Sequence, residues 1–322
     1  MKRACKYLTS KVMVMLACEF HTTVEKKYHH MKIKISLFTI SSILLCSCSS
    51  FYQLINVSPS SNLKEISFSQ EAPNSLYQFY YADTLANDYL SELRKQYKID
   101  LLVKEEKSEL DKIKAVLDWT SRQWEHNGSN NPTKQDALTI LKEAREGKQF
   151  RCVEYGIVAT AALNSIGIPA RTLGLKTRDI EKVMRGAGHV VTEVYSTELG
   201  KWIFIDPQFN ILPVLNGKPL NGVEFQKEIF NQNTNLKLIN KKGELSNEEA
   251  ENYINWIGKY LYYFDVLFDQ KTMNSGKFTT INGMTKLTLV PVGQKEPRIF
   301  QRRYKIDYSY YTHSLNDFYR KP

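Results

Sequence analysis

The sequence predicts an α+β fold in which helices pack on an antiparallel β-sheet. Amphipathic segments with helical periodicity precede residue 150, an alanine-rich apolar segment follows at 152–166, and alternating segments come after it. Hydrophobic residues make up 42% of the chain and aromatic residues 12%, which is typical of a packed globular protein. The residues after position 47 suffice for one large domain or two small ones.

Several helices are predicted before the alanine-rich segment. Apolar side chains recur every four residues in 76–97, and residues 110–124 place Leu, Ile and Trp on one face with Lys and Glu opposite. Asn131 and Pro132 then resemble an N-cap with proline at the first helical position, and Gly147 would end that helix. A later amphipathic helix is predicted over 247–270.

Three strands are predicted after the apolar helix, over 169–177, 188–196 and 201–206. The segment 188–196 alternates strictly between its two faces, and so does 201–206. The polar residues 197–200 supply a turn, so the last two strands should form a hairpin.

The hairpin predicts that His189 and Asp206 lie on one face of the sheet. With a four-residue turn Ser196 pairs with Lys201 and Asp206 lies opposite Val191; a two-residue turn would place Asp206 directly opposite His189. Facing residues are about 4.5–5.5 Å apart and diagonal ones about 7–8 Å, so either register keeps the pair within reach. A slip of one residue would separate them. Taken singly, each also has a plain structural interpretation, as a residue at a strand start or in a turn.

Cys152 begins the predicted helix at 152–166. The unpaired N–H groups and the dipole at a helix N-terminus stabilise negative charge, which favours a thiolate nucleophile; a thiol that merely packs in a core is the alternative. The other four cysteines all lie within the first 48 residues. After residue 48 the chain has three histidines, His126, His189 and His313, and their scattered positions give no metal-ligand spacing. We expect neither a metal nor a cofactor.

A lipoprotein signal is predicted from Met31. Two lysines precede an apolar run over 35–45, and small residues then surround Cys46 and Cys48. The run is too short for a membrane span, which needs roughly 20 residues. The layout resembles a bacterial lipobox with Cys48 as the lipidated residue, because bulky Leu45 directly precedes Cys46. A buried N-terminal helix is the alternative.

The expected organisation follows from this segment. We expect a non-native extension over 1–30, a signal peptide over 31–47 and a tether over 48–75. The folded domain is expected over 76–322, with its core at 105–215. The whole chain has 44 basic and 34 acidic residues, but 1–47 contain eight and two of these, which leaves a net charge of +4. No run of five basic residues occurs, so a nucleic-acid partner is not indicated.

Cys152, His189 and Asp206 occur in this order within three segments that resemble those of a known superfamily. The segments FRCVEYGIVATAALNSIGIPAR, GAGHVVTEVY and KWIFIDPQFN resemble the cysteine, histidine and aspartate blocks of the transglutaminase-like superfamily, which has a papain-like fold. The similarity covers about 115–215. It implies a Cys-His-Asp catalytic triad, and it implies that Gln123 or Trp124 helps to bind the oxyanion, although no motif selects between them.

The resemblance implies attack of a thiolate on an amide carbonyl, with a thioester intermediate. Release by water would make the protein a peptidase or amidase, and release by an amine a transglutaminase; hydrolysis is favoured for a lipid-anchored protein of the bacterial cell envelope. The substrate would be a protein or peptide. The alternative is a binding or scaffold lipoprotein that keeps the fold without turnover, but retention of all three residue types favours an enzyme.

Overall fold

The computed structural model describes residues 65–81, 86–270 and 279–322. The chain divides into two units, Met1–Val57 and Ser58–Pro322, and every described residue belongs to the second. The predicted extension, the signal segment, Cys48 and the first part of the tether therefore lie outside the described residues. Among the helices of the described ranges, none has the length and apolar character needed to cross a membrane.

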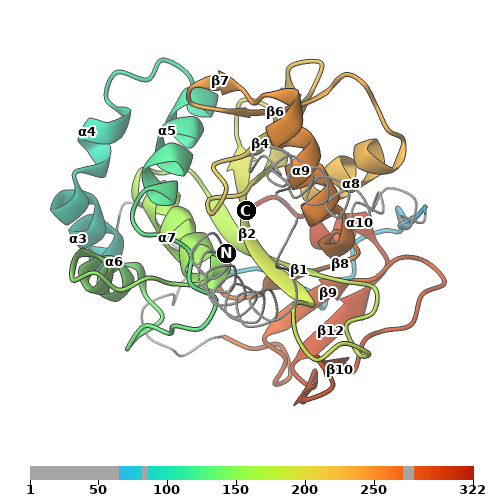
Figure 1. The fold of residues 1–322 in the computed structure, drawn as a ribbon. Coiled ribbons are helices and arrows are strands. Elements are labelled where there is room, and N and C mark those ends of the chain that lie inside the picture. The colour runs from blue at the N-terminus through green and yellow to red at the C-terminus, as the bar shows by residue number, and fades with distance from the viewer. Residues whose placement is uncertain (1–64, 82–85, 271–278) are drawn as a thin grey trace, which may run out of the picture. The chain divides into compact units, whose positions relative to one another are not determined.

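A six-stranded sheet occupies the centre of the second unit (Figure 1). Its strands lie in the order β12-β9-β8-β1-β2-β3. All neighbours are antiparallel except β9 and β12, which run parallel. The strand bounds are β1 Ala170–Lys176, β2 Gly188–Ser196, β3 Lys201–Ile205, β8 Tyr263–Leu267, β9 Lys286–Leu289 and β12 Ser309–Thr312. The α+β class is confirmed, with one parallel pair in a sheet predicted to be antiparallel.

Helices cover both faces of this sheet. The helices on the N-terminal side are α3 Asp88–Tyr97, α4 Ile99–Val103, α5 Glu109–Ser121, α6 Ala137–Arg145 and α7 Cys152–Ser165. The later ones are α8 Gly222–Phe230, α9 Asn247–Ile257, the 3₁₀ turn η2 Gly258–Tyr260 and α10 Leu315–Phe318. Two smaller sheets complete the fold, formed by β4 Leu212–Leu215, β5 Lys218–Pro219, β6 Leu236–Asn240 and β7 Gly243–Glu244, and by β10 Ile299–Phe300 and β11 Tyr304–Lys305.

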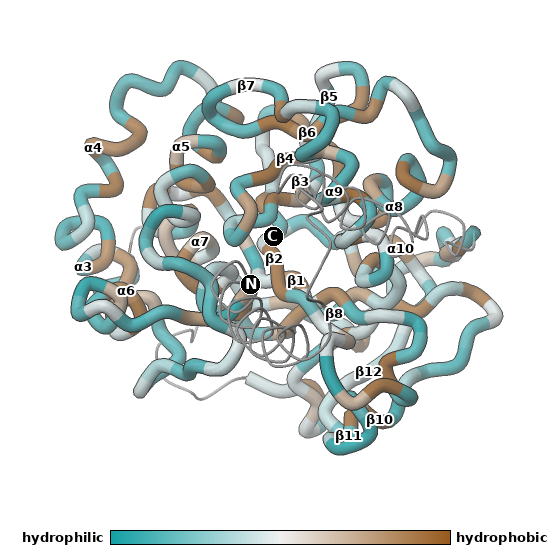
Figure 2. The backbone as a smooth tube through the Cα atoms, viewed as in Figure 1, coloured by the Kyte–Doolittle hydropathy of each residue, from teal (hydrophilic) through white to brown (hydrophobic). Residues whose placement is uncertain are grey.

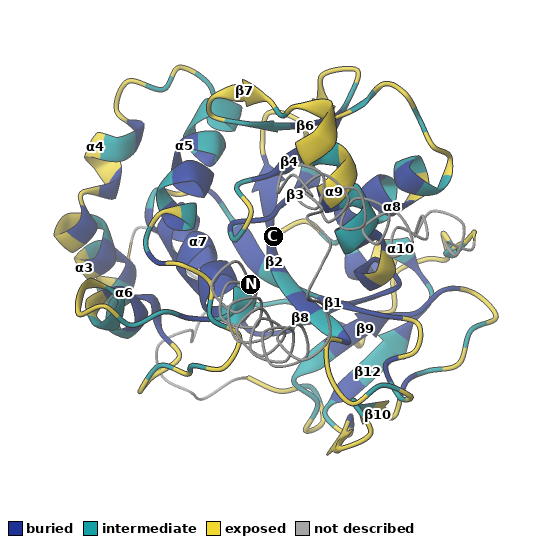
Figure 3. Cartoon of the chain, in the orientation of Figure 1, coloured by how far each residue is buried: buried dark blue, intermediate teal, exposed yellow. Residues whose placement is uncertain are grey.

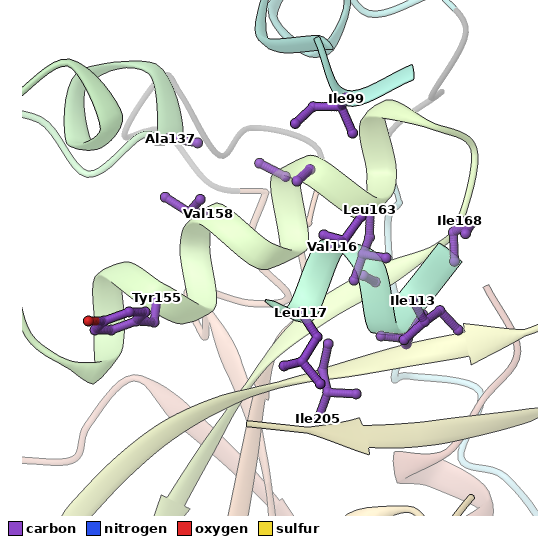
Figure 4. Close-up of a cluster of buried hydrophobic side chains, with 14 of the residues drawn as sticks. Ile99, Ile113, Val116, Leu117, Ala137, Tyr155, Val158, Leu163, Ile168 and Ile205 are labelled. Carbon is purple, nitrogen blue, oxygen red and sulfur yellow. The ribbon is translucent and has the colours of Figure 1, made fainter. Parts of the chain in front are cut away.

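The alternation along the strands divides the buried side chains between two cores. Val194 of β2 packs with α3–α7, whereas Val191 of the same strand packs with α8 and α9. In Figure 4 side chains of α5 and α7 point toward one another above Ile205 of β3. Figure 3 shows α7 and the central strands as buried and much of α9 as exposed, and Figure 2 shows hydrophilic residues along the outer loops.

Helix α7 lies directly against β2 because Gly156 has no side chain. A Cβ atom at Gly156 would lie 2.9 Å from Cγ1 of Val190 and 3.3 Å from the carbonyl oxygen of Val191. The helix ends where predicted, since Gly167 follows it with φ of +82°. The sequence thus places the first residue of α7, Cys152, close to the strand that begins with Gly188 and His189.

The register of the β2–β3 hairpin is the one predicted for a four-residue turn. Ser196 pairs with Lys201, and the ladder continues to Thr192 and Ile205. Asp206 follows directly and forms an isolated bridge with Ile211.

Three predicted helices have different bounds. Helix α3 begins at Asp88 and is capped by Asn87, so the helix predicted over 76–97 was wrong for the described residues 76–81 and 86–87. Helix α6 begins after Asp136, whose carboxylate accepts the Thr139 N–H at 2.9 Å and replaces the predicted Asn131–Pro132 start. The helix predicted over 247–270 ends at Ile257, and its second half forms η2 and β8.

Residues 65–75, which the sequence assigns to the tether, pack against the C-terminal part of the domain. Ser69 bridges to Ser314, and its N–H donates to the carbonyl oxygen of His313 at 2.8 Å. The ring of Phe68 meets that of Phe264 edge-on at 6.2 Å. The packed structure therefore includes residues that precede the predicted domain boundary at 76.

Candidate active site

His189 and Asp206 are in direct contact, and both are buried. The Nε2 atom of His189 lies 2.7 Å from Oδ2 of Asp206. The side chains of His189 and Asp206 are 2% and 0% exposed, respectively. The pair forms because Asp206 extends β3 by one residue on the sheet face that also carries His189.

Asp206 has further hydrogen-bond partners that the sequence analysis missed. The hydroxyl of Tyr253 on α9 donates to Oδ2 at 2.8 Å, and the N–H groups of Gln208 and Phe209 donate to Oδ1 at 3.0 and 3.4 Å. Burial, and then the Asp206 carboxylate, raise the pKa of Tyr253 well above its ordinary value, so the hydroxyl stays protonated and remains a donor. Tyr253 lies in the segment predicted as an amphipathic helix, over 247–270, but nothing in the sequence pairs it with Asp206.

Aromatic rings surround the imidazole of His189. Trp256 meets it edge-on with ring centroids 4.9 Å apart, and Tyr260 and Phe209 lie at 6.0 and 6.1 Å. These rings restrict the orientation of the imidazole and exclude water from one side of it. They come from α9, η2 and the turn after β3, so the second core supports the site.

The electrostatic state of His189 is set by opposing effects. Burial lowers the pKa of His189, but the charge and hydrogen bond of Asp206, with smaller contributions from the Cys152 side chain, raise the pKa to about 9. The ring is therefore an imidazolium at neutral pH. Because Nε2 faces Asp206, Nδ1 is the ring nitrogen left to interact with the sulfur of Cys152.

Cys152 is half-buried at the first position of α7. It lines a cavity of about 220 Å³ together with His189. The preceding N–H, from Arg151, donates to the carboxylate of Glu154 at 3.1 Å, and the Arg151 guanidinium also pairs with Glu154 at 2.6 Å. Arg151 thus offsets the negative charge that Glu154 places in the first turn, so the helix N-terminus still favours an anionic sulfur.

The two predicted oxyanion residues have different surroundings. The amide of Gln123 donates to the carbonyl oxygen of Trp119 at 2.8 Å, one turn back in α5. The Trp124 ring packs against Tyr155 and Phe150, which flank Cys152 in the sequence, with centroids 4.4 and 5.6 Å away. Within the described part of the chain, the buried Nε1 of Trp124 has no hydrogen-bond partner.

His126 follows Trp124 in the loop after α5 and is exposed. Partial desolvation, and then the charge of His189, lower the pKa of His126. It therefore lies close enough to His189 for their charges to interact, a placement that the sequence analysis did not anticipate. His313 is separate, with its Nδ1 2.7 Å from the Val290 carbonyl oxygen. In the described ranges, no group of three His, Cys, Asp or Glu side chains has the arrangement of a metal site.

Residues 96–207 match the family model of the transglutaminase-like superfamily. These residues form a transglutaminase-like domain. The match includes Cys152, His189 and Asp206, and it begins within α3 and ends just after β3. Proteins of this superfamily are typically cysteine-dependent enzymes.

Solved structures of low similarity include a candidate cysteine protease from Cytophaga hutchinsonii, 16% identical over 42% of this chain and 48% of that one, with a TM-score of 0.30. A candidate protease from Parabacteroides distasonis is 16% identical over 49% and 30%, and a TGase is 20% identical over 37% and 30%, each with a TM-score of 0.27. The matches span less than half the length of each of these proteins. A search of curated proteins gave no match.

Proposed function

We propose that this protein is a cysteine-dependent acyl-transfer enzyme that acts on amide bonds of proteins or peptides. The observation that carries the proposal is the position of His189, which contacts Asp206 through Nε2 and lines the same cavity as Cys152. Cys152 is the nucleophile, His189 the proton carrier, and Asp206 the group that fixes the ring and favours its protonated form.

In the first half-reaction the Cys152 thiolate forms a bond to the carbonyl carbon, and the C–N bond breaks. The imidazolium of His189 gives its proton to the departing amine, which leaves Cys152 as a thioester and His189 neutral. Water then attacks the thioester, His189 takes a proton from it, and the C–S bond breaks, so that the carboxylic acid departs and the Cys152 thiolate and His189 imidazolium are restored. An amine in place of water would give a new amide instead. We favour water.

The negative oxygen of each tetrahedral intermediate needs donors. The N–H groups in the first turn of α7 have no acceptor within the helix. They lie at the end of the helix that carries Cys152. Trp124 is the better side-chain donor of the two predicted, because the Gln123 amide is already bonded to Trp119 and the Nε1 of Trp124 is not paired within the described residues.

We also propose that the protein is exported and held at the cell envelope by a lipid on Cys48. This rests on the sequence between Met31 and Cys48. Substitution Cys48→Ser should move the protein from the membrane fraction to the soluble fraction, and mass spectrometry should then find no acylated N-terminal peptide. Equal membrane retention of both proteins would contradict the anchor.

The proposed activity is tested by incubating wild-type protein and Cys152→Ala with an extract of envelope proteins and sequencing the peptides. Hydrolysis predicts new N-termini that appear only with the wild-type protein, whereas amine transfer predicts lysine-linked adducts. The two proteins should show the same thermal unfolding, because Cys152 is half-buried and alanine is small. Identical peptide sets from both would favour the binding or scaffold lipoprotein.

A further inference from the structure

Two adjoining cavities form a groove on the face of the central sheet beside the start of α7. The cavity of about 220 Å³ contains Cys152 and His189 in its wall, and its neighbour of about 250 Å³ continues along the sheet to Leu267. Val153 and Gly174 line both cavities. A chain that filled both cavities would lie over β1, β8 and β9.

Three charged side chains meet on the sheet face of this groove. Lys176 of β1 and Lys286 of β9 both form ion pairs with Asp265 of β8, and the Nζ atom of Lys286 lies 2.5 Å from Oδ1. Asp265 pairs in register with Gly174, whose Cβ, if present, would lie 2.8 Å from Cγ of Asp265. The missing side chain of Gly174 thus makes room for the carboxylate between the two lysines.

With both lysines protonated, this cluster has one more positive charge than negative. Asp265 is the sole acidic side chain among the described residues that line the two cavities, and it faces two ammonium groups. Each ammonium group has three N–H donors, so one carboxylate does not use them all. Burial, and then the charge of Lys286, lower the pKa of Lys176 well below its ordinary value, while burial lowers the pKa of Lys286. A second anion would relieve this imbalance.

We propose that Lys176 and Lys286 bind a carboxylate of the acyl donor, which makes the preferred substrate an acidic peptide or isopeptide. The proposal rests on the proposed function, because it takes Cys152 as the point of attack. The carboxylate lies close to the scissile amide, since Lys176 and Lys286 line the same cavity as Cys152. A cationic substrate group is disfavoured because both oxygens of Asp265 already face lysines.

The test uses pairs of acetylated dipeptide p-nitroanilides that differ only in Glu against Gln at one of the two positions. For wild-type protein we expect kcat/KM to favour Glu by about tenfold or more at one position, as one charge-assisted hydrogen bond provides. Lys286→Met should bring the Glu-to-Gln ratio close to one. Lys237→Met should retain the ratio, because Lys237 pairs with Glu244 on the surface of another sheet. A wild-type ratio near one, or an equal loss of both rates in Lys286→Met, would overturn the proposal.

Binding measured without chemistry separates this proposal from the proposed function. In Cys152→Ala, calorimetric titration with the same peptides should show tighter binding of the Glu member, and the added Lys286→Met substitution should remove the difference. If no p-nitroanilide is hydrolysed yet the lysine-dependent preference persists, the enzymatic proposal fails and the carboxylate site stands. If hydrolysis depends on Cys152 but neither assay shows a preference for Glu, the carboxylate site fails alone. Lys176→Met provides the second variant should Lys286→Met not fold.

Discussion

Oδ2 of Asp206 accepts hydrogen bonds from two residues that lie far apart in the sequence, His189 on β2 and Tyr253 on α9. The two distances are 2.7 and 2.8 Å. This shared oxygen links the hairpin that carries the predicted site to a helix of the second core. The protonation of His189 therefore depends on Asp206 directly and on Tyr253 through it.

Substitution Asp206→Asn should lower the pH above which activity is lost. Burial lowers the pKa of His189, and the Asp206 carboxylate is the main cause that raises it to about 9, so without the carboxylate only the smaller contributions of Cys152 oppose burial. For wild-type protein the rate of acylation should fall above about pH 9, where the imidazolium loses its proton. In Asp206→Asn this alkaline fall in the rate should occur at lower pH, and the maximal rate should fall by roughly 10²–10⁴-fold. If the alkaline fall in the rate of single-turnover acylation stayed at the same pH, the role assigned to Asp206 would be contradicted.

Substitution Tyr253→Phe should shift the alkaline fall in the acylation rate to higher pH. Without the hydroxyl donor the negative charge on Oδ2 is less dispersed, so it holds the His189 proton more strongly and the pKa of His189 rises further. The free energy of unfolding should fall by about 1–3 kcal/mol in a urea titration, because one buried acceptor loses a partner. Tyr263→Phe is the matched control, since its hydroxyl donates to the Lys295 carbonyl oxygen instead; it should leave the pH profile as in wild type.

Substitution Gly156→Ala should separate α7 from β2. The new methyl group would meet Val190 and the carbonyl oxygen of Val191, and the helix would have to shift. We expect a loss of about 1–3 kcal/mol in the free energy of unfolding, partly offset by the better helix propensity of alanine, together with slower alkylation of Cys152. Gly128→Ala is the control, because its nearest neighbour would be Cε1 of His126 at 3.8 Å. If the two variants behaved alike, the close contact of α7 with β2 would not determine the position of the sulfur.

Substitution Glu193→Gln should strongly destabilise the domain. Arg171 and Glu193 are fully buried and paired at 2.7 Å, and Arg171 also donates to the carbonyl oxygen of Phe318 at 2.9 Å. Loss of one partner leaves a buried guanidinium without its counter-charge, which costs about 3–5 kcal/mol. Glu244→Gln, which breaks the exposed pair with Lys237, should change the unfolding free energy by about 0–1 kcal/mol. Similar urea midpoints for the two variants would contradict this difference.

The segment from Cys152 to Asp206 was predictable because its contacts are local in the chain. Strict alternation fixed the faces, so both turn lengths that the sequence allowed put His189 and Asp206 on one face, and Gly167 marked the end of α7. The contact between His189 and Asp206 follows from those features alone. Asp136 shows the limit of such reasoning: a stronger cap lay a few residues beyond the proline that appeared to start the helix.

The supporting residues were not predictable because distant segments supply them. Tyr253 and Trp256 reach the site only once α9 packs on the second face of the sheet, and α9 ends earlier than its apolar periodicity suggests. Lys176, Asp265 and Lys286 belong to three strands whose order depends on the whole topology. The periodicity within one segment does not predict which side chains of distant segments lie together.

The central claim is that His189, held by Asp206, activates the sulfur of Cys152 as the nucleophile. It is tested most directly by the rate of alkylation of Cys152 with iodoacetamide between about pH 5 and pH 10, followed by mass spectrometry of the peptide that contains Cys152. His189→Gln is the comparison, because its amide still donates a hydrogen bond to Asp206. Wild-type protein should be alkylated markedly faster than His189→Gln at neutral pH, because only the wild-type sulfur has a neighbouring base. Superimposable profiles that both rise near pH 8.5 would contradict it.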